Sequence, residues 1–134
     1  MNAPTVMIVA GEASADLHAA RLIAALHRRV PALRCFGIGG PALRAAGADI
    51  RIDAARLAVV GITEVAAKAG DLWRSLRAAR SWLARHRPDL LVLVDFPDFN
   101  LMVAKTAKRL GVPVLYYVSP QIWAWRSGRI HKIK

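Results

Sequence analysis

The chain has 134 residues, of which 55% are hydrophobic and 22% charged, and this length and apolar content indicate one globular domain and exclude a disordered chain. No apolar run approaches the roughly 20 residues of a membrane-spanning helix, and the first residues lack the basic start of a signal peptide, so we expect a cytoplasmic protein. The single cysteine, Cys35, excludes an internal disulfide and agrees with a reducing compartment.

The charge of the chain is strongly basic and unevenly distributed. Lysine and arginine number 20 against 9 acidic residues, for a net charge of +11. Residues 1–98 hold 13 of the basic and all 9 acidic side chains, whereas residues 99–134 hold 7 basic and no acidic ones. This balance favours an anionic partner such as a phosphorylated substrate or an acidic membrane surface. An arginine-rich composition from a GC-rich genome would explain it equally well.

The first half of the chain predicts short strands that alternate with helices. The expected elements are a strand over 5–9, a helix over 15–29, a strand over 34–38, a short helix from 41 to 47 and a short strand over 50–52. Pro31 closes the first long helix, and the Gly39-Gly40-Pro41 segment opens the short one.

The second half continues the same alternation with longer elements. A helix is expected over 64–86, a fully buried strand over 90–94, a helix over 99–110 that Gly111 stops, and a second buried strand over 112–118. Alternating strands and helices predict an α/β fold with a Rossmann-like, doubly wound parallel sheet. We expect residues 1–134 to form a single domain of this kind.

The turn after the first strand, Gly11 to Asp16, is the first candidate site. It has one glycine, so it matches neither a Walker A loop nor a dinucleotide fingerprint. Ser14 and Asp16 can simply cap the following helix. The alternative is a substrate-binding loop, in which the acidic side chains would favour sugar hydroxyls over a phosphate group.

The second candidate site follows the buried strand 90–94, which delivers Asp95, Asp98 and Asn100 to its carboxyl end. Ligands of open α/β sheets bind beyond that end of the strands. Asp98 is either a helix N-cap or a general base that takes a proton from a substrate hydroxyl. Asn100 either orients that hydroxyl or caps the helix, and Asp95 is interpreted as structural.

Two aromatic segments are candidates for contacts with lipid or sugar. Gln121, Trp123 and Arg126 follow the last strand, where tryptophans can contact a sugar or acyl chain and the arginine can clamp a phosphate, unless the aromatic residues pack against another domain. The 62–73 segment begins with residues 62–69, which are more apolar than a solvated helix start should be. Its candidate membrane or acyl-chain contacts are Ile62, Val65, Ala66, Ala69, Leu72 and Trp73.

The rest of the long helix divides into two faces. Leu72, Leu76, Ala79 and Leu83 are expected on the sheet, and the basic face with Arg74, Arg77 and Arg85 in water. The 4 histidines have no metal-ligand spacing, and no nucleic-acid motif is visible. We therefore expect no metal, no cofactor and no nucleic-acid partner.

Five segments, in order along nearly the whole chain, resemble the lipid-A-disaccharide synthase family. They are Gly11-Glu12-Ala13-Ser14-x-Asp16, Phe36-Gly37-Ile38-Gly39-Gly40, Val60-Gly61-Ile62-Thr63-Glu64-Val65, Asp95-Phe96-Pro97-Asp98-Phe99-Asn100 and Tyr117-Val118-Ser119-Pro120-Gln121-Ile122-Trp123-Ala124-Trp125-Arg126. Each motif alone is weak, but five of them in register are highly specific.

The resemblance implies a GT-B glycosyltransferase with two Rossmann-like domains, of which this chain would supply the N-terminal, acceptor-side one. The family joins UDP-2,3-diacylglucosamine to 2,3-diacylglucosamine 1-phosphate with inversion, releases UDP, and works as a peripheral protein on the cytoplasmic face of the inner membrane. Asp98 would be the base for the acceptor 6-hydroxyl. Gly11, Glu12, Ser14 and Asn100 would line the sugar pocket, with Gln121, Trp123 and Arg126 as further substrate contacts.

Two features depart from the family pattern. Ala15 stands where the family usually has glycine. Alanine is harmless there if it is the first helical residue, and strained if the position needs a positive φ. The donor-binding half is also absent from this chain, so we expect the 134 residues alone to be inactive. The alternative function is a non-catalytic Rossmann-like module that binds a glycolipid or an anionic membrane surface.

Overall fold

The computed structural model describes residues 3–54, 65–94 and 97–117. Five parallel strands form one sheet in the order β3-β2-β1-β4-β5. Their bounds are β1 Thr5–Ala10, β2 Arg34–Gly39, β3 Asp49–Asp53, β4 Leu90–Val94 and β5 Val114–Tyr117. This order and direction confirm the Rossmann-like, doubly wound α/β fold.

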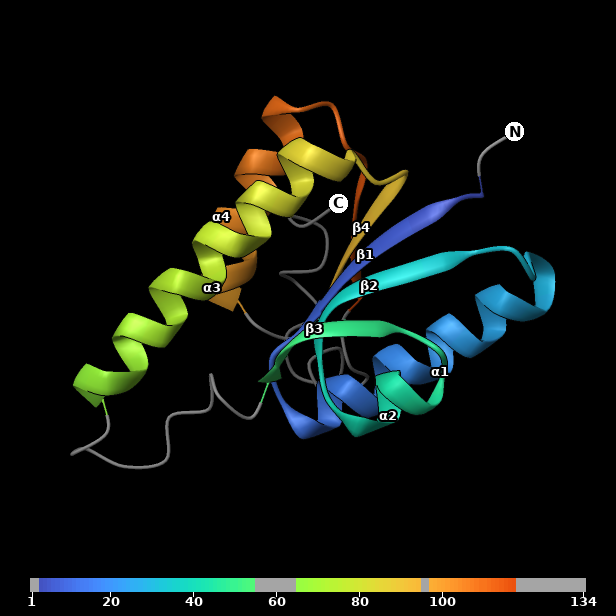
Figure 1. Ribbon diagram of the computed structural model, residues 1–134, viewed down its shortest axis with the longest axis horizontal. Helices are drawn as coiled ribbons and strands as arrows, with labels where there is room; N and C mark the ends of the chain where they lie inside the picture. Colours follow the sequence, from blue (N-terminus) through green and yellow to red (C-terminus); the bar gives the residue numbers. More distant parts are fainter. Residues whose placement is uncertain (1–2, 55–64, 95–96, 118–134) are drawn as a thin grey trace, which may run out of the picture.

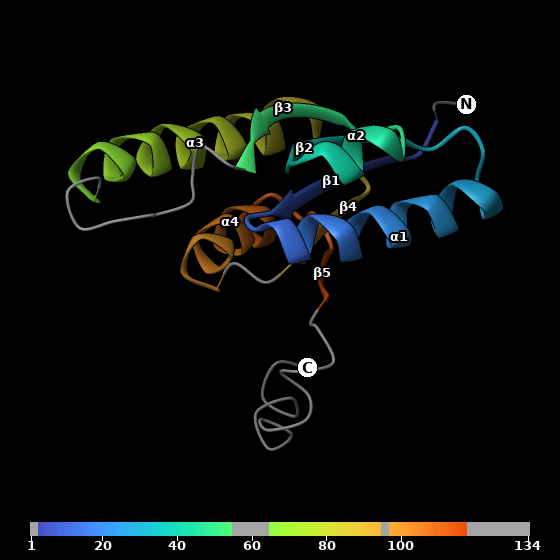
Figure 2. The ribbon, with the colours of Figure 1, turned by 90° about the horizontal axis from the view of Figure 1, so that it is seen from below.

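In the described part of the chain, helices cover both faces of the sheet, as Figures 1 and 2 show. Helices α1 (Ala13–Arg29) and α2 (Pro41–Ala45) cover one face, and α3 (Val65–His86) and α4 (Pro97–Arg109) cover the other. The expected helices and strands are all present, with ends that differ by a few residues. No helix in the described part of the chain is both long and apolar enough to cross a membrane.

Two hydrophobic cores lie on opposite sides of the sheet because side chains alternate along each strand. In β1, Met7 and Val9 face α3 and α4, whereas Val6, Ile8 and Ala10 face α1 and α2. The predicted apolar face of α3 packs as expected, with Leu76, Ala79 and Leu83 buried. A sheet covered on both faces explains why β1 and β4 are continuous apolar runs.

Candidate functional site at the carboxyl edge of the sheet

The reversal of strand order lies between β1 and β4, the pair at the centre of the sheet. The chain winds from β1 to β2 and β3 on one side, then crosses to β4 and β5 on the other. Ala10, the last residue of β1, is the register partner of Val94, which is the last residue of β4. Val94 is in turn the partner of Tyr117, the last residue of β5. The carboxyl ends of these three strands therefore lie at the same edge, which is where α/β sheets bind ligands.

The turn from β1 into α1 is one side of this edge. Gly11 is buried, whereas Glu12 and Ser14 are exposed. Glu12 occupies the N-cap position of α1, but its side chain makes no capping hydrogen bond. Ser14 lies in the first turn of the helix and not before it. The predicted capping of α1 by Ser14 or Asp16 is therefore wrong, and both exposed side chains remain available to a ligand.

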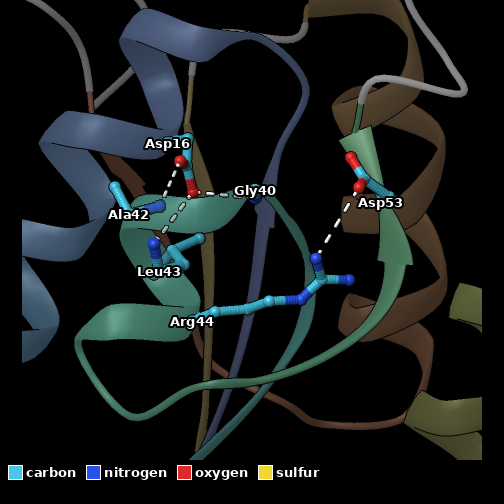
Figure 3. A network of polar contacts seen from close by, with 6 residues as sticks. All are labelled: Asp16, Gly40, Ala42, Leu43, Arg44 and Asp53. Atoms are coloured by element: carbon cyan, nitrogen blue, oxygen red, sulfur yellow. Dashed lines mark hydrogen bonds and ion pairs between the residues drawn. The ribbon is translucent and has the colours of Figure 1, made fainter.

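Asp16 has a different partner from the one expected. It is 4% exposed, and its carboxylate accepts hydrogen bonds from the backbone N–H groups of Gly40 at 2.8 Å, Ala42 at 2.9 Å and Leu43 at 3.1 Å. These groups are unsatisfied donors at the start of α2, where the helix dipole also favours an anion. Figure 3 shows the carboxylate of α1 directed at this end of α2. Asp16 thus fixes the two helices to each other beside the carboxyl edge.

A glycine makes this approach possible. A Cβ atom on Gly40 would lie 2.9 Å from Asp16 Oδ2, which is closer than real Cβ atoms come to an oxygen. Arg44 of α2 also forms an ion pair with Asp53 at the end of β3, at 3.7 Å between Nη1 and Oδ2. That pair is largely exposed and contributes little to stability. The Arg44 pair joins α2 to β3, whereas the buried carboxylate of Asp16 joins α2 to α1.

Ala15 is compatible with the backbone of this turn. It is the third residue of α1 and is completely buried. Among the residues that the structure describes, Arg87 is the only non-glycine residue with a positive φ. Alanine in place of glycine is therefore unstrained, as the helical alternative predicted.

The β4 side of the edge carries the residues expected to do chemistry. Asp98 is the second residue of α4 and Asn100 the fourth, so both belong to the first turn of that helix and neither is its N-cap. Asn100 is 3% exposed, yet its Oδ1 has no hydrogen-bond partner. A buried amide oxygen without a donor is costly. Asn100 is therefore available to accept a hydrogen bond from a bound group.

A pair of rings at this edge was not predicted from the sequence. His18 of α1 and Tyr117 at the end of β5 meet edge to face, with 6.4 Å between ring centroids. His18 lies one helical turn beyond Ser14, so the two are on the same face of α1. The spacing of Ser14 and His18 was the only signal of this pair in the sequence. The ring that His18 contacts is decided by the packing of β5 beside β4.

Only some of the remaining candidates belong to the described part of the chain. Asp95, Ile62, Gln121, Trp123 and Arg126 lie outside the described residues. Val65, Ala66 and Ala69 belong to the start of α3. Leu72 packs partly buried against the core, whereas Trp73 is 56% exposed. Of these two neighbours, Trp73 is the one that a partner can reach. No cluster of three or more potential metal ligands occurs among the residues that the structure describes.

Comparison with known proteins shows the family of this chain. Residues 6–134 match the model of the lipid-A-disaccharide synthetase family. The chain belongs to this family. It is 53% identical over 128 residues to the lipid-A-disaccharide synthase of Geobacter metallireducens, and 52% identical over 132 residues to that of Nitrosococcus oceani. These alignments cover 96% and 98% of this chain but 33% and 34% of the relatives. The chain thus spans about a third of the lipid-A-disaccharide synthases that it matches.

Solved structures with the same fold include a glycosyltransferase. The calicheamicin glycosyltransferase CalG4 superposes with a TM-score of 0.55 at 20% identity, over 96% of this chain and 36% of that one. MurG of Acinetobacter baumannii superposes with a TM-score of 0.53 at 13% identity, over 87% and 35%. At these identities the likeness concerns the fold alone. It agrees with the Rossmann-like domain expected of a lipid-A-disaccharide synthase.

Proposed function

We propose that this chain forms the N-terminal, acceptor-side domain of a lipid-A-disaccharide synthase. The complete enzyme would transfer a sugar from UDP-2,3-diacylglucosamine to 2,3-diacylglucosamine 1-phosphate and release UDP. The observation that carries the proposal is that β1 and β4 end side by side at the switch point, where the strand order reverses, and that the segments around the starts of α1 and α4 resemble the family. A second, donor-binding domain would supply the opposite wall of the cleft, so we expect the 134 residues alone to be inactive.

Asp98 is proposed as the general base. Its carboxylate would take the proton of the acceptor 6-hydroxyl while that oxygen forms a bond to the anomeric carbon of the donor. The bond from that carbon to the UDP oxygen would break, so that UDP leaves with the electron pair and the configuration inverts. Asp98 is in the first turn of α4, where the positive end of the helix dipole favours the ionised carboxylate that a base requires.

The acceptor sugar would be held from both sides of the switch point. Asn100, with its buried unpartnered Oδ1, would accept a hydrogen bond from a sugar hydroxyl or from a group that positions it. Gly11 lets the turn after β1 approach the sugar, and Glu12 and Ser14 are exposed to bind hydroxyls. Gln121, Trp123 and Arg126 are proposed contacts that follow β5.

Diacylated substrates require the enzyme to meet a lipid surface, so we also propose a peripheral position on the cytoplasmic face of the inner membrane. The exposed indole of Trp73 supports contact of α3 with a bilayer or an acyl chain, because tryptophan favours membrane interfaces. Ile62, Val65, Ala66 and Ala69 are proposed to extend this contact, and Leu72 to support it from the core side.

An activity assay on the protein as its gene encodes it tests the role of Asp98. Asp98→Asn should lower kcat about 10²- to 10⁴-fold, because general base catalysis contributes that much. The control is Asp71→Asn, which removes an exposed carboxylate whose partner is Arg74, at 3.6 Å, and should leave kcat within about twofold.

The same variants separate the enzyme from a non-catalytic module that binds a glycolipid or an anionic membrane. Co-sedimentation with vesicles should persist in Asp98→Asn, because the base is not part of the proposed membrane contact. Absence of transfer by the wild-type protein, with vesicle binding intact, would favour the binding module. An Asp98→Asn variant with normal kcat would refute the assignment of the base.

A further inference from the structure

A hollow lined by basic side chains lies between α3 and α4. Its volume is about 510 Å³. Arg80 of α3 lines it together with four residues of α4, which are Lys105, Thr106, Lys108 and Arg109. Four of the five lining residues are cationic and none is acidic. The hollow therefore has the charge of an anion site.

Two polar atoms at the hollow have no partner. Thr106 is 6% exposed, and its Oγ1 has no hydrogen-bond partner. Arg80 Nε is also inaccessible to solvent and unpartnered. Buried donors are nearly always satisfied in folded proteins, because an unsatisfied one costs free energy. Both groups are hydrogen-bond donors, and both residues line the hollow.

The cations of the hollow have no carboxylate partners in the described part of the chain. The ion pairs found there join Arg44 to Asp53, Arg51 to Asp49 and Arg74 to Asp71. Interaction with the helix dipole accounts for Lys108 and Arg109, because they lie in the last turn of α4. It does not account for Arg80, which is inside α3, or for the hydroxyl of Thr106.

The hollow is separate from the carboxyl edge. Helix α4 starts after the carboxyl end of β4 and runs back along the sheet to β5, as Figure 1 shows. Thr106 is eight residues beyond Asp98, which corresponds to roughly 12 Å along the helix axis. Lys108 and Arg109 lie farther still, toward the amino edge of the sheet. The inference therefore does not rest on the proposed transfer reaction.

We propose that this hollow binds a phosphate group. A phosphate has several oxygens that can accept from the Arg80 guanidinium, the Thr106 hydroxyl and a lysine ammonium at once. Its negative charge also relieves the repulsion among the four cations. The phosphate belongs either to a dissolved ion or to an anionic phospholipid headgroup. Met102, one turn before Thr106 on α4, is 43% exposed and gives a lipid an apolar contact beside the headgroup.

Equilibrium dialysis of radiolabelled inorganic phosphate against the protein as its gene encodes it tests the proposal. Ionic strength is held constant with chloride. Binding should be saturable, and Arg80→Gln and Thr106→Val should each weaken it about tenfold, because each removes one hydrogen bond to a charged group. Arg77→Gln is the matched control, since Arg77 is an exposed arginine one turn away on α3 that does not line the hollow. It should change binding less than twofold.

Vesicles distinguish the two sources of phosphate. Co-sedimentation with phosphatidylglycerol vesicles, relative to phosphatidylcholine vesicles, should fall in Arg80→Gln and be competed by inorganic phosphate if the ligand is a headgroup. Binding of inorganic phosphate without that dependence indicates a dissolved phosphate. Both outcomes support the site.

Two results would overturn the proposal. One is the absence of saturable binding in both assays, and the other is an equal loss in Arg77→Gln and Arg80→Gln, which indicates diffuse attraction to net charge. Thr106→Ser keeps the hydroxyl and should keep phosphate binding. This variant therefore tests the role of the hydroxyl even if Thr106→Val does not fold. Transfer activity is measured in parallel, and its loss in Asp98→Asn is independent of phosphate binding at the hollow.

Discussion

Single side chains decide how the helices are held at the carboxyl edge. Asp16 belongs to α1 but satisfies three N–H groups at the start of α2. The partners lie 24 to 27 residues away in the chain, so this role is not visible in local sequence. In the local pattern, Asp16 resembles a residue that caps its own helix.

Asp16→Asn should destabilise the fold. The amide keeps one acceptor oxygen and places an NH₂ group against a backbone donor, so at least one buried N–H loses its partner. We expect the free energy of unfolding to fall by about 1–3 kcal/mol, as measured by urea denaturation. Ser14→Ala, an exposed change two residues away, should stay within about 0.5 kcal/mol of wild type. Equal effects of the two changes would contradict the role assigned to the carboxylate.

The burial of Cys35 should make its thiol unreactive in the folded protein. It is 5% exposed in β2, and burial raises the pKa of its thiol from 9.0 to about 12. The thiolate is the reactive form, so alkylation by iodoacetamide at pH 8 should be about 10³-fold slower in the folded protein than in urea. Rapid labelling of the native protein would contradict the burial.

The raised pKa of Cys35 also predicts how the free energy of unfolding changes at alkaline pH. The thiol of the unfolded chain releases its proton near pH 9.0, whereas that of the folded chain keeps it to about pH 12. The folded state therefore binds more protons over this interval, and the free energy of unfolding falls as the pH rises through it. Cys35→Ala should show a smaller fall between these pH values in urea titrations.

At the scale of the secondary-structure element, β2 passes so close to β1 that one of its residues has to be glycine. Gly37 has φ +149°, and a Cβ atom on it would lie 1.9 Å from the carbonyl oxygen of Ile8 in β1. The register of β2 against β3 also shifts between Gly37 and Ile38. Glycine is therefore required here by both the close approach and the backbone conformation.

Gly37→Ala should be strongly destabilising, whereas Gly70→Ala should not. The first change adds backbone strain and a steric clash, and we expect a loss of about 2–5 kcal/mol in the free energy of unfolding. Gly70 lies inside α3, and a Cβ atom on it would have nothing within 4 Å, so alanine should stabilise by about 0.5–1 kcal/mol. Thermal and urea unfolding measure the free energy of unfolding of both variants. Similar losses in the two variants would contradict the close contact between β1 and β2.

Helix α3 divides its surface as the periodicity predicted. Leu76, Ala79 and Leu83 are buried, and Arg74, Arg77 and Arg85 are exposed. Trp82 lies at the boundary, packs partly buried against the core and meets Phe36 edge to face at 6.2 Å between centroids. Its partner comes from β2, so the helical pattern alone did not identify it.

At the scale of the whole molecule, the sheet brings together residues that are far apart in the chain. The turn after β1 and the first turn of α4 are separated by more than 80 positions, and they lie at the same edge of the sheet because β1 pairs with β4. The order β3-β2-β1-β4-β5 creates one switch point on this sheet. The basic hollow between α3 and α4 lies away from this switch point, toward the amino edge of the sheet. The sequence alone did not show that the cationic side chains of these two helices lie together.

The sequence by itself determined the elements, their alternation and the motifs that identify the family. These properties depend on local periodicity, on turn residues and on residue identity, which are all legible along a single chain. It also placed Asp98 and Asn100 after a buried strand, but left each of them as either cap or substrate contact. Only the tertiary structure placed them inside the first turn of α4, paired Asp16 with α2, and left Asn100 Oδ1 and Thr106 Oγ1 buried without a hydrogen-bond partner. These outcomes depend on which strands pair and which helices pack, and such contacts are set by the burial of both faces of the sheet rather than by neighbours in the sequence.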